Sequence, residues 1–242
     1  MQIPRMRLLQ RARLKNVAAR LRALYGPPSR PLTTDPFELI LLENCAYLVD
    51  DERRRTVFTR LKRQVGTTPA AILGRSTAQL ADIIRDGGMR PPMRAAKLHS
   101  AAHIALDIGL AKLRAAVRRS PKEAKQLLQR FPGIAEPGAD KILLFAGGQV
   151  SLGPDSNALR VLYRLGFGKQ EKDYGRTYRS AAEAVRPELP RNFRWLIRAH
   201  QLLRRHGQET CKRAAPHCEA CPLTASCCWF KEHGGRSGVA EQ

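Results

Sequence analysis

Four cysteines close to the end of the sequence have the spacing of a metal-binding loop. They follow the pattern C-x6-C-x2-C-x5-C, with a proline after the third: Cys211, Cys218, Cys221 and Cys227. Four thiolates in so short a loop can enclose a [4Fe-4S] cluster or a structural zinc ion, because both accept tetrahedral sulfur ligation. The spacing predicts metal binding and leaves both metals open. We expect Cys228, beside a ligand, and Cys45, in an apolar helix, to be spectators.

Two carboxylates elsewhere could take part in acid–base chemistry. Glu43 lies within the apolar run FELILLENCAYLV, where burying an acid is costly unless it has partners or a function. Asp155 precedes the segment ALRVLYRL and suits the N-cap position of a helix. Each residue therefore has a structural interpretation, pairing with an arginine for Glu43 and capping for Asp155, beside a catalytic one.

The segment from about residue 125 to 147 predicts two helices joined by the turn PGIAEPGA. Such a turn exposes backbone N–H groups at the start of the second helix, where the positive end of the helix dipole can hold a phosphate. We predict DNA contacts at Gly133, Ala135 and Gly138.

A second glycine-containing turn leads into a helix with basic residues near its start. We predict that Arg90, Arg94 and Lys97 contact the nucleic-acid backbone there. The alternative is a plain turn between helices with solvated basic side chains.

The composition indicates a polyanionic partner. The 242 residues carry 43 Lys and Arg against 21 Asp and Glu, a formal charge of +22 spread along most of the chain. Nucleic acid is the expected partner, and an inert basic surface is the alternative. No apolar run reaches the length of about 18 residues needed for a membrane span, and the start lacks a signal-peptide pattern. We therefore expect no membrane association, an intracellular, cytoplasmic location (nucleoid-associated if bacterial) and a monomer.

Helical periodicity runs through the whole sequence. Residues 1–25 alternate basic and apolar residues at helical spacing. This pattern predicts one or two amphipathic helices packed on their own domain, and a membrane-surface helix is the alternative interpretation. Further helices are predicted from Pro36 and Asp51 onward, over Tyr174–Val185 and over Arg191–His206. Because no strand alternates convincingly and no repeat occurs, we predict an all-α fold.

Three segments carry a resemblance to a known family. The turn PGIAEPGA, the stretch DSNALRVLYRLG and the HGQETC segment before the cysteine loop resemble the endonuclease III superfamily of helix-hairpin-helix DNA glycosylases. The resemblance covers about residues 36–227. It implies a [4Fe-4S] cluster in loop 211–227, double-stranded DNA as partner, and two helical domains. One domain would comprise residues 1–35 and 166–242, the other residues 36–165.

The same resemblance assigns catalytic residues. Glu43 falls where adenine glycosylases of this superfamily carry their catalytic glutamate, and Asp155 matches the catalytic aspartate. The resemblance implies base-excision repair: Glu43 would protonate the leaving base or position water, and Asp155 would stabilise the oxocarbenium charge at the sugar. Asp155, Ser156 and Asn157 resemble the Asp-Gly-Asn of adenine glycosylases. Asn157 would orient the two carboxylates.

The sequence also departs from the family pattern within the hairpin. Pro137 stands where bifunctional relatives carry a nucleophilic lysine, which predicts a monofunctional enzyme. Lys141, one helical turn further on, is expected to point to a different face. Ala135 replaces a glycine and Glu136 adds a negative charge, so we expect weaker phosphate anchoring.

Two further departures concern the DNA lesion. NCAYLVDD replaces the family's wedge residues, leaving Tyr47 and Leu48 as candidates to fill the space of an extruded base. Only a short tail follows Cys228, whereas the adenine glycosylases of this superfamily add a domain that recognises 8-oxoguanine. The resemblance therefore does not favour adenine opposite 8-oxoguanine as the substrate. Two other functions stay open at this point: a noncatalytic DNA-lesion or DNA-structure binding protein, and a bifunctional glycosylase and AP lyase that uses a displaced lysine.

Overall fold

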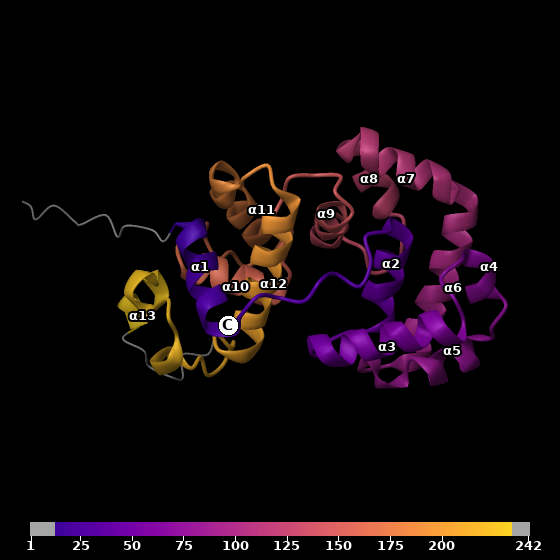
Figure 1. The fold of residues 1–242 in the computed structure, drawn as a ribbon, viewed down its shortest axis with the longest axis horizontal. Coiled ribbons are helices and arrows are strands. Elements are labelled where there is room, and N and C mark those ends of the chain that lie inside the picture. The colour runs from indigo at the N-terminus through magenta and orange to yellow at the C-terminus, as the bar shows by residue number, and fades with distance from the viewer. Residues whose placement is uncertain (1–12, 234–242) are drawn as a thin grey trace, which may run out of the picture. The chain divides into compact units, whose positions relative to one another are not determined.

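The structure, a computed structural model, describes residues 13–233. Within this range it contains helices and no β-strand, so the predicted all-α fold is confirmed (Figure 1). The predicted N-terminal helix is described only from Leu14, because residues 1–12 lie outside the described range. The α-helices are α1 Leu14–Tyr25, α2 Pro36–Cys45, α3 Asp51–Gln64, α4 Pro69–Leu73, α5 Thr77–Ile83, α6 Pro91–Ile108, α7 Leu110–Arg119, α8 Pro121–Leu128, α9 Glu136–Phe145, α10 Ser156–Arg164, α11 Tyr174–Val185, α12 Phe193–Glu209 and α13 Cys228–His233.

Four short 3-10 helices complete the regular structure of the described residues. They are η1 Arg85–Gly87, η2 Arg186–Glu188, η3 Cys218–Ala220 and η4 Thr224–Ser226, the last two lying in the cysteine loop. None of the helices in residues 13–233 has the length and apolar character that crossing a bilayer requires.

The chain forms two compact units. The terminal unit contains the described residues 13–28, 154–190 and 194–233, and the central unit contains residues 29–153 and 191–193. Residues 154–165, which the sequence analysis groups with the central domain, have their contacts in the terminal unit, because α10 packs against α11 and α13. Asp155 therefore lies in the same unit as the cysteine loop.

Helix α2 is the core element of the central unit. Pro36 occupies its first turn, and Asp35 caps it by accepting hydrogen bonds from the backbone N–H groups of Phe37 and Glu38. Ile40 and Leu41 are completely buried, and α2 contacts α3, α6, α7 and α9. Burial on nearly every face explains why its sequence is almost continuously apolar.

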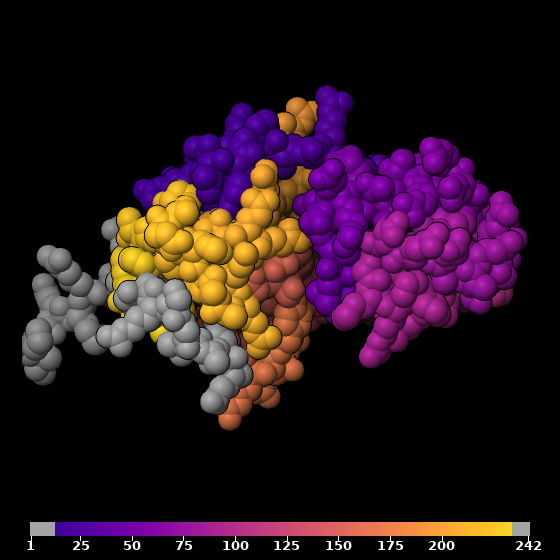
Figure 2. All heavy atoms as spheres, turned by 90° about the horizontal axis from the view of Figure 1, so that it is seen from below, coloured from indigo at the N-terminus to yellow at the C-terminus, as the bar shows by residue number. Residues whose placement is uncertain are grey.

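In the terminal unit the cysteine loop packs against the first helix (Figure 2). The Arg20 guanidinium of α1 donates to the Pro222 carbonyl oxygen at 3.1 Å. At the end of α1 the Tyr25 hydroxyl lies 3.0 Å from Nδ1 of His206 and 2.7 Å from Oγ1 of Thr210. These contacts tie the start of the described chain to the segment that holds the cysteines.

Candidate active site and cysteine cavity

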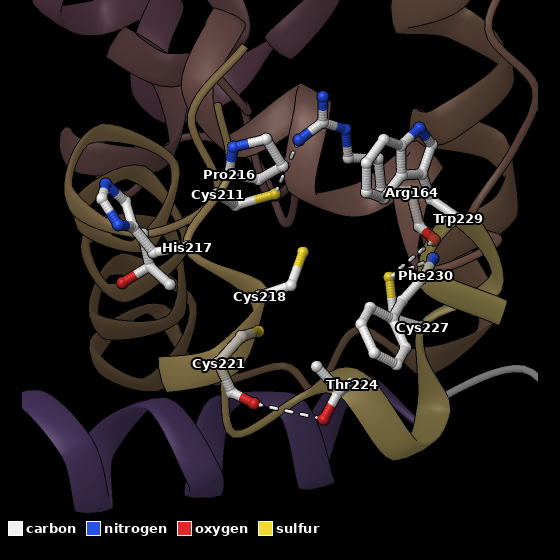
Figure 3. Close-up of a pocket in the computed structure, with 11 residues that line it drawn as sticks. Arg164, Cys211, Pro216, His217, Cys218, Cys221, Thr224, Cys227, Trp229 and Phe230 are labelled. Carbon is white, nitrogen blue, oxygen red and sulfur yellow. Dashed lines mark hydrogen bonds between the residues drawn. The ribbon is translucent and has the colours of Figure 1, made fainter. Parts of the chain in front are cut away.

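The four predicted metal ligands line one cavity. Their sulfur atoms are directed into a common space that is also bordered by Arg164, Trp229 and Phe230 (Figure 3). The depression holds about 290 Å³ of space that no atom fills. The structure thus brings together Cys211, Cys218, Cys221 and Cys227, as their spacing predicts.

Cys228 is the natural contrast to these four. It does not line the cavity, and its thiol lies 3.7 Å from the Leu165 carbonyl oxygen. Cys45 is fully buried in α2, where burial raises the pKa of its thiol to about 12. Neither residue is placed with the metal-ligand candidates.

Helix α10 supplies the basic residues that hold the cysteine loop. The buried Arg164 guanidinium donates to Sγ of Cys211 at 3.3 Å and to the carbonyl oxygens of Lys212 and Arg213, and it lies 4.6 Å from the centre of the Trp229 ring. Its charge therefore lies beside the sulfur-lined space, where it favours anionic thiolate ligands. Sequence reasoning missed Arg164, because a basic residue on an amphipathic helix normally faces solvent.

The cavity suits a cofactor that binds the four sulfurs at separate atoms. Burial raises the pKa of the Cys221 and Cys227 thiols to about 11, so ligation here displaces protons. Between residues 13 and 233, no three Cys, His, Asp or Glu side chains converge as ligands of a single ion. The four sulfurs instead face the cavity from its walls, an arrangement that fits a cluster in which each iron takes one cysteine.

Asp155 is an N-cap residue whose second oxygen meets an arginine. Oδ1 accepts hydrogen bonds from the N–H groups of Asn157 at 3.0 Å and Ala158 at 2.9 Å. Oδ2 lies 3.1 Å from Nε of Arg204, an ion pair that the sequence analysis did not anticipate. The carboxylate is one-fifth exposed, so it is positioned, paired and still accessible.

Asn157 contacts the cysteine loop indirectly, through Arg160. Its side-chain oxygen accepts a hydrogen bond from Nη2 of Arg160 at 2.9 Å, and Nε of the same arginine donates to the Cys211 carbonyl oxygen at 2.8 Å. In the structure, Asn157 thus orients Arg160.

Glu43 is paired with two cations within the central unit. Its Oε1 accepts a short hydrogen bond from Nη2 of Arg54, and its Oε2 lies 2.5 Å from Nζ of Lys141. The three side chains are between 14% and 19% exposed, so solvent screens the pairs only in part. Burial alone would lower the pKa of Arg54, but its attraction to Glu43, Cys45 and Asp51 and its hydrogen bond to Glu43 together outweigh the burial, so this pKa is raised. The pairs favour the ionised form of Glu43.

The prediction that Lys141 points to a different face is wrong. Helix α9 begins at Glu136, so Pro137 and Lys141 are four residues apart within one helix and lie on the same face, one turn apart. The structure accordingly places the Lys141 ammonium on Glu43.

The turn between α8 and α9 has the predicted hairpin form. Gly133 adopts a left-handed φ of 77°, and a Cβ atom at this position would lie 3.1 Å from Oδ1 of Asn44 and 3.6 Å from Nζ of Lys97. Lys97 is thereby placed beside the hairpin. Ala135 is the exposed N-cap of α9, and Gly138 lies half-buried in its first turn.

The negative charge of Glu136 is paired within the hairpin. Its carboxylate lies 2.9 Å from Nζ of Lys125, which also lies 3.0 Å from Oδ1 of Asp140. Burial alone would lower the pKa of Lys125, but the hydrogen bonds to the two carboxylates outweigh it and raise this pKa. Pairing with Lys125 reduces the repulsion that Glu136 exerts on an approaching phosphate.

Two loops of the central unit present apolar side chains side by side. The backbone N–H of Tyr47 donates to the Gly87 carbonyl oxygen at 2.7 Å, and Tyr47 forms an isolated bridge with Gly88. Tyr47, Leu48 and Met89 are 56%, 71% and 61% exposed. Sequence reasoning identified the first two but missed Met89, although its place directly after two glycines is a signal for a projecting loop residue.

Arg94 ties these two loops together and is not available to DNA. Its buried guanidinium donates to five carbonyl oxygens, including those of Cys45, Ile84 and Gly88. These bonds use all five N–H groups of the guanidinium. The prediction that Arg94 contacts a phosphate is therefore wrong, and the role of this residue is structural. Arg90 is exposed and has a left-handed φ of 54°.

Comparisons with known proteins identify the family of this chain. The chain matches no protein-family model. It is 30% identical over 164 residues to endonuclease III of Treponema pallidum (strain Nichols), covering 68% of this chain and 70% of that protein. It is 26% identical over 181 residues to a thymine/uracil-DNA glycosylase of Pyrobaculum aerophilum, covering 66% of this chain and 78% of that protein.

Solved structures share the fold. A non-covalent endonuclease III–DNA complex superposes with a TM-score of 0.69 at 21% identity, covering 92% of this chain and 97% of that chain. A thermostable thymine-DNA glycosylase superposes with a TM-score of 0.67 at 15% identity, covering 90% and 97%. The fold is thus that of the helix-hairpin-helix DNA glycosylases. The chain belongs to the endonuclease III family and is a DNA glycosylase of base-excision repair, as the resemblance implied.

Proposed function

We propose that this enzyme is a monofunctional DNA glycosylase, which hydrolyses the N-glycosidic bond of a damaged or mispaired base in duplex DNA. The proposal rests on the hairpin, which offers no free lysine amine for attack on the sugar. Pro137 has no amine to attack the sugar, and Nζ of Lys141 is held in an ion pair with Glu43 at 2.5 Å, whereas a nucleophile needs a free amine. Water is then the remaining nucleophile.

Asp155 would act on the sugar. Because two N–H groups and Arg204 surround its carboxylate, Asp155 is stabilised in the ionised form. An ionised carboxylate can stabilise the positive charge that develops on the sugar as the base leaves, and it can accept a proton from the attacking water. Glu43, ionised by its two partners, is suited to orienting groups and poorly suited to donating a proton.

Double-stranded DNA is the proposed ligand of the hairpin and the neighbouring loops. The exposed turn at Gly133 and Ala135, together with Lys97 and Arg90, offers backbone N–H groups and positive charge to phosphates. Tyr47, Leu48 and Met89 would fill the space left by an extruded nucleotide, since exposed apolar side chains on firmly held loops can insert between bases.

We propose a [4Fe-4S] cluster as the resident cofactor of the cysteine cavity. Cys211, Cys218, Cys221 and Cys227 would each bind one iron, with Arg164 beside the Cys211 sulfur. When bound, the cluster would cross-link η3, η4 and the segment after α12, because Cys218 and Cys221 lie in and directly after η3, Cys227 directly follows η4, and Cys211 follows α12 by two residues.

The reaction type is tested on a panel of duplexes that each carry one lesion or mismatch. We expect at least one duplex to gain an alkali-labile site, and we expect no covalent protein–DNA adduct when the same reaction contains borohydride. Borohydride reduces an imine between a lysine and the sugar, so a trapped adduct would show a lyase and contradict the monofunctional mechanism.

The apolar loop residues are tested by Leu48→Ala and Met89→Ala. Each substitution is expected to weaken binding of a duplex containing an abasic site by about tenfold, because burying a leucine or methionine side chain in the gap of the base stack contributes on the order of 1.5–3 kcal/mol. Binding is measured by fluorescence anisotropy. The control is Leu106→Ala, which removes a leucine that is 57% exposed on α6. Equal affinity of all three variants would exclude the proposed role.

A further inference from the structure

Glu43 lies at the position of a proton-donating glutamate, but its pairing does not suit that task. A general acid must be protonated when the bond breaks. In this structure a cation is bound to each oxygen of Glu43, Arg54 to Oε1 and Lys141 to Oε2. Protonating the carboxyl group would weaken two partly buried ion pairs at once, and this cost opposes the acid form.

The two cations differ in what they can do for a leaving base. The guanidinium of Arg54 keeps its proton under all ordinary conditions, and its pKa is raised further in this structure. An ammonium group such as that of Lys141 differs from a guanidinium in that it can transfer a proton to a basic nitrogen or oxygen. Of the two partners of Glu43, only Lys141 can therefore act as an acid.

Position also favours Lys141. It lies on α9 on the same face as Pro137, one turn further along the helix that begins at the proposed DNA-binding turn. Its backbone is fixed by the close approach of Gly153, where a Cβ atom would lie 2.7 Å from Cα of Lys141. The ammonium is held on Glu43 at 2.5 Å while its side chain remains 16% exposed. A proton donor requires a fixed backbone and an accessible donor group, and Lys141 has both.

We propose that Lys141 is the general acid of the reaction and that Glu43 is the residue that positions it. As the N-glycosidic bond breaks, its electron pair goes to the base, and a proton moves from Nζ of Lys141 to that base. The oxygen of water bonds to C1′ of the sugar, and the released proton of water goes to the Asp155 carboxylate. Exchange with solvent returns both residues to their starting states. This inference rests on the proposed glycosylase function.

The test compares single-turnover base release by the wild type, Lys141→Met and Lys141→Arg. We expect both variants to be slower by about 100-fold, because general acid catalysis contributes on the order of 10²–10⁴ in rate. Arginine keeps the charge and the ion pair with Glu43 but cannot give up its proton, so it separates proton transfer from charge. It also preserves the fold if the methionine variant proves unstable.

The competing mechanism, with Glu43 as the acid, predicts the opposite result. Removing the Lys141 charge would make Glu43 easier to protonate, so Lys141→Met would be as fast as the wild type or faster. Base release that stays within threefold of the wild-type rate in either Lys141 variant overturns the proposal. The matched control is Lys62→Met, since Lys62 pairs with another glutamate of α2, Glu38, at 2.7 Å.

The pH profile provides a second readout. Lys141 faces Glu43 from α2, which also pairs with Arg54 from α3, while Lys125 of α8 pairs with Glu136 and Asp140. With Lys141 as acid, the wild-type rate is expected to stay level between about pH 6 and 8, well below the ordinary lysine pKa. A tenfold fall per pH unit across that range would indicate a carboxylic acid and overturn the proposal.

Base release by the wild type and by the variants distinguishes the glycosylase function from the role of Lys141. If the wild type releases bases and Asp155→Asn does not, while both Lys141 variants remain fast, the glycosylase function stands and the role of Lys141 is wrong. If the wild type releases no base from any duplex, the proposed function fails, and the role of Lys141 fails with it.

Discussion

Replacing Asp155 with asparagine is expected to slow base release by about 1,000-fold and to leave the fold intact. Removing a charge that stabilises a transition state commonly costs 10²–10³ in rate. Asparagine is itself a good N-cap residue, so it can still accept the hydrogen bonds from the N–H groups of Asn157 and Ala158. The rate is measured under single-turnover conditions, and stability is measured by thermal unfolding.

The chain contains a closely matched control for this substitution. Asp35 caps α2 through Oδ1, which accepts from the N–H groups of Phe37 and Glu38, and its Oδ2 lies 2.7 Å from Nε of Arg114. This is the arrangement of Asp155 with its two N–H donors and Arg204. Asp35→Asn should change stability as Asp155→Asn does but keep wild-type base release. Similar loss of activity in both variants would mean that capping, and not transition-state charge, explains the effect of Asp155.

The sequence was a good guide wherever local chemistry decides the structure. The cap at Asp155 follows from an acid placed before an amphipathic segment, and the helix predicted over Tyr174–Val185 has these bounds in the structure. The cysteine spacing correctly predicted that the four thiols share one site, because three of the four cysteines lie within ten residues, from Cys218 to Cys227. In each case the partners are close in sequence.

Contacts between distant segments could not be predicted in the same way. Lys141 and Glu43 are 98 residues apart, and Arg94 lies 49 residues from Cys45. At the level of sequence, Arg94 is one of several basic residues at a helix start. Its burial depends on how the loop after α2 meets the loop before α6, which is a property of tertiary packing. The roles of Arg94, Lys141 and Arg204 therefore required the structure.

Replacing one cavity cysteine should remove the proposed cluster. Purified wild-type protein is expected to contain about four iron atoms per chain and to absorb broadly near 400 nm, and Cys218→Ser should lose both signals because one corner of the cluster has no ligand. The terminal unit should also unfold at a lower temperature, since metal binding at such a site contributes to folding free energy. Iron analysis, absorption and thermal unfolding measure these effects.

The adjacent cysteine makes this experiment specific. Cys228→Ser changes a thiol that lies outside the cavity, 3.7 Å from the Leu165 carbonyl oxygen, so iron content and absorption should match those of the wild type. A colourless wild-type protein that contains one zinc per chain would contradict the cluster. It would also require the sulfurs to converge on one ion, at about 2.3 Å each, whereas within residues 13–233 no three such ligands converge on a single point. The metal analysis thus tests the geometry of the cavity as well as the identity of its occupant.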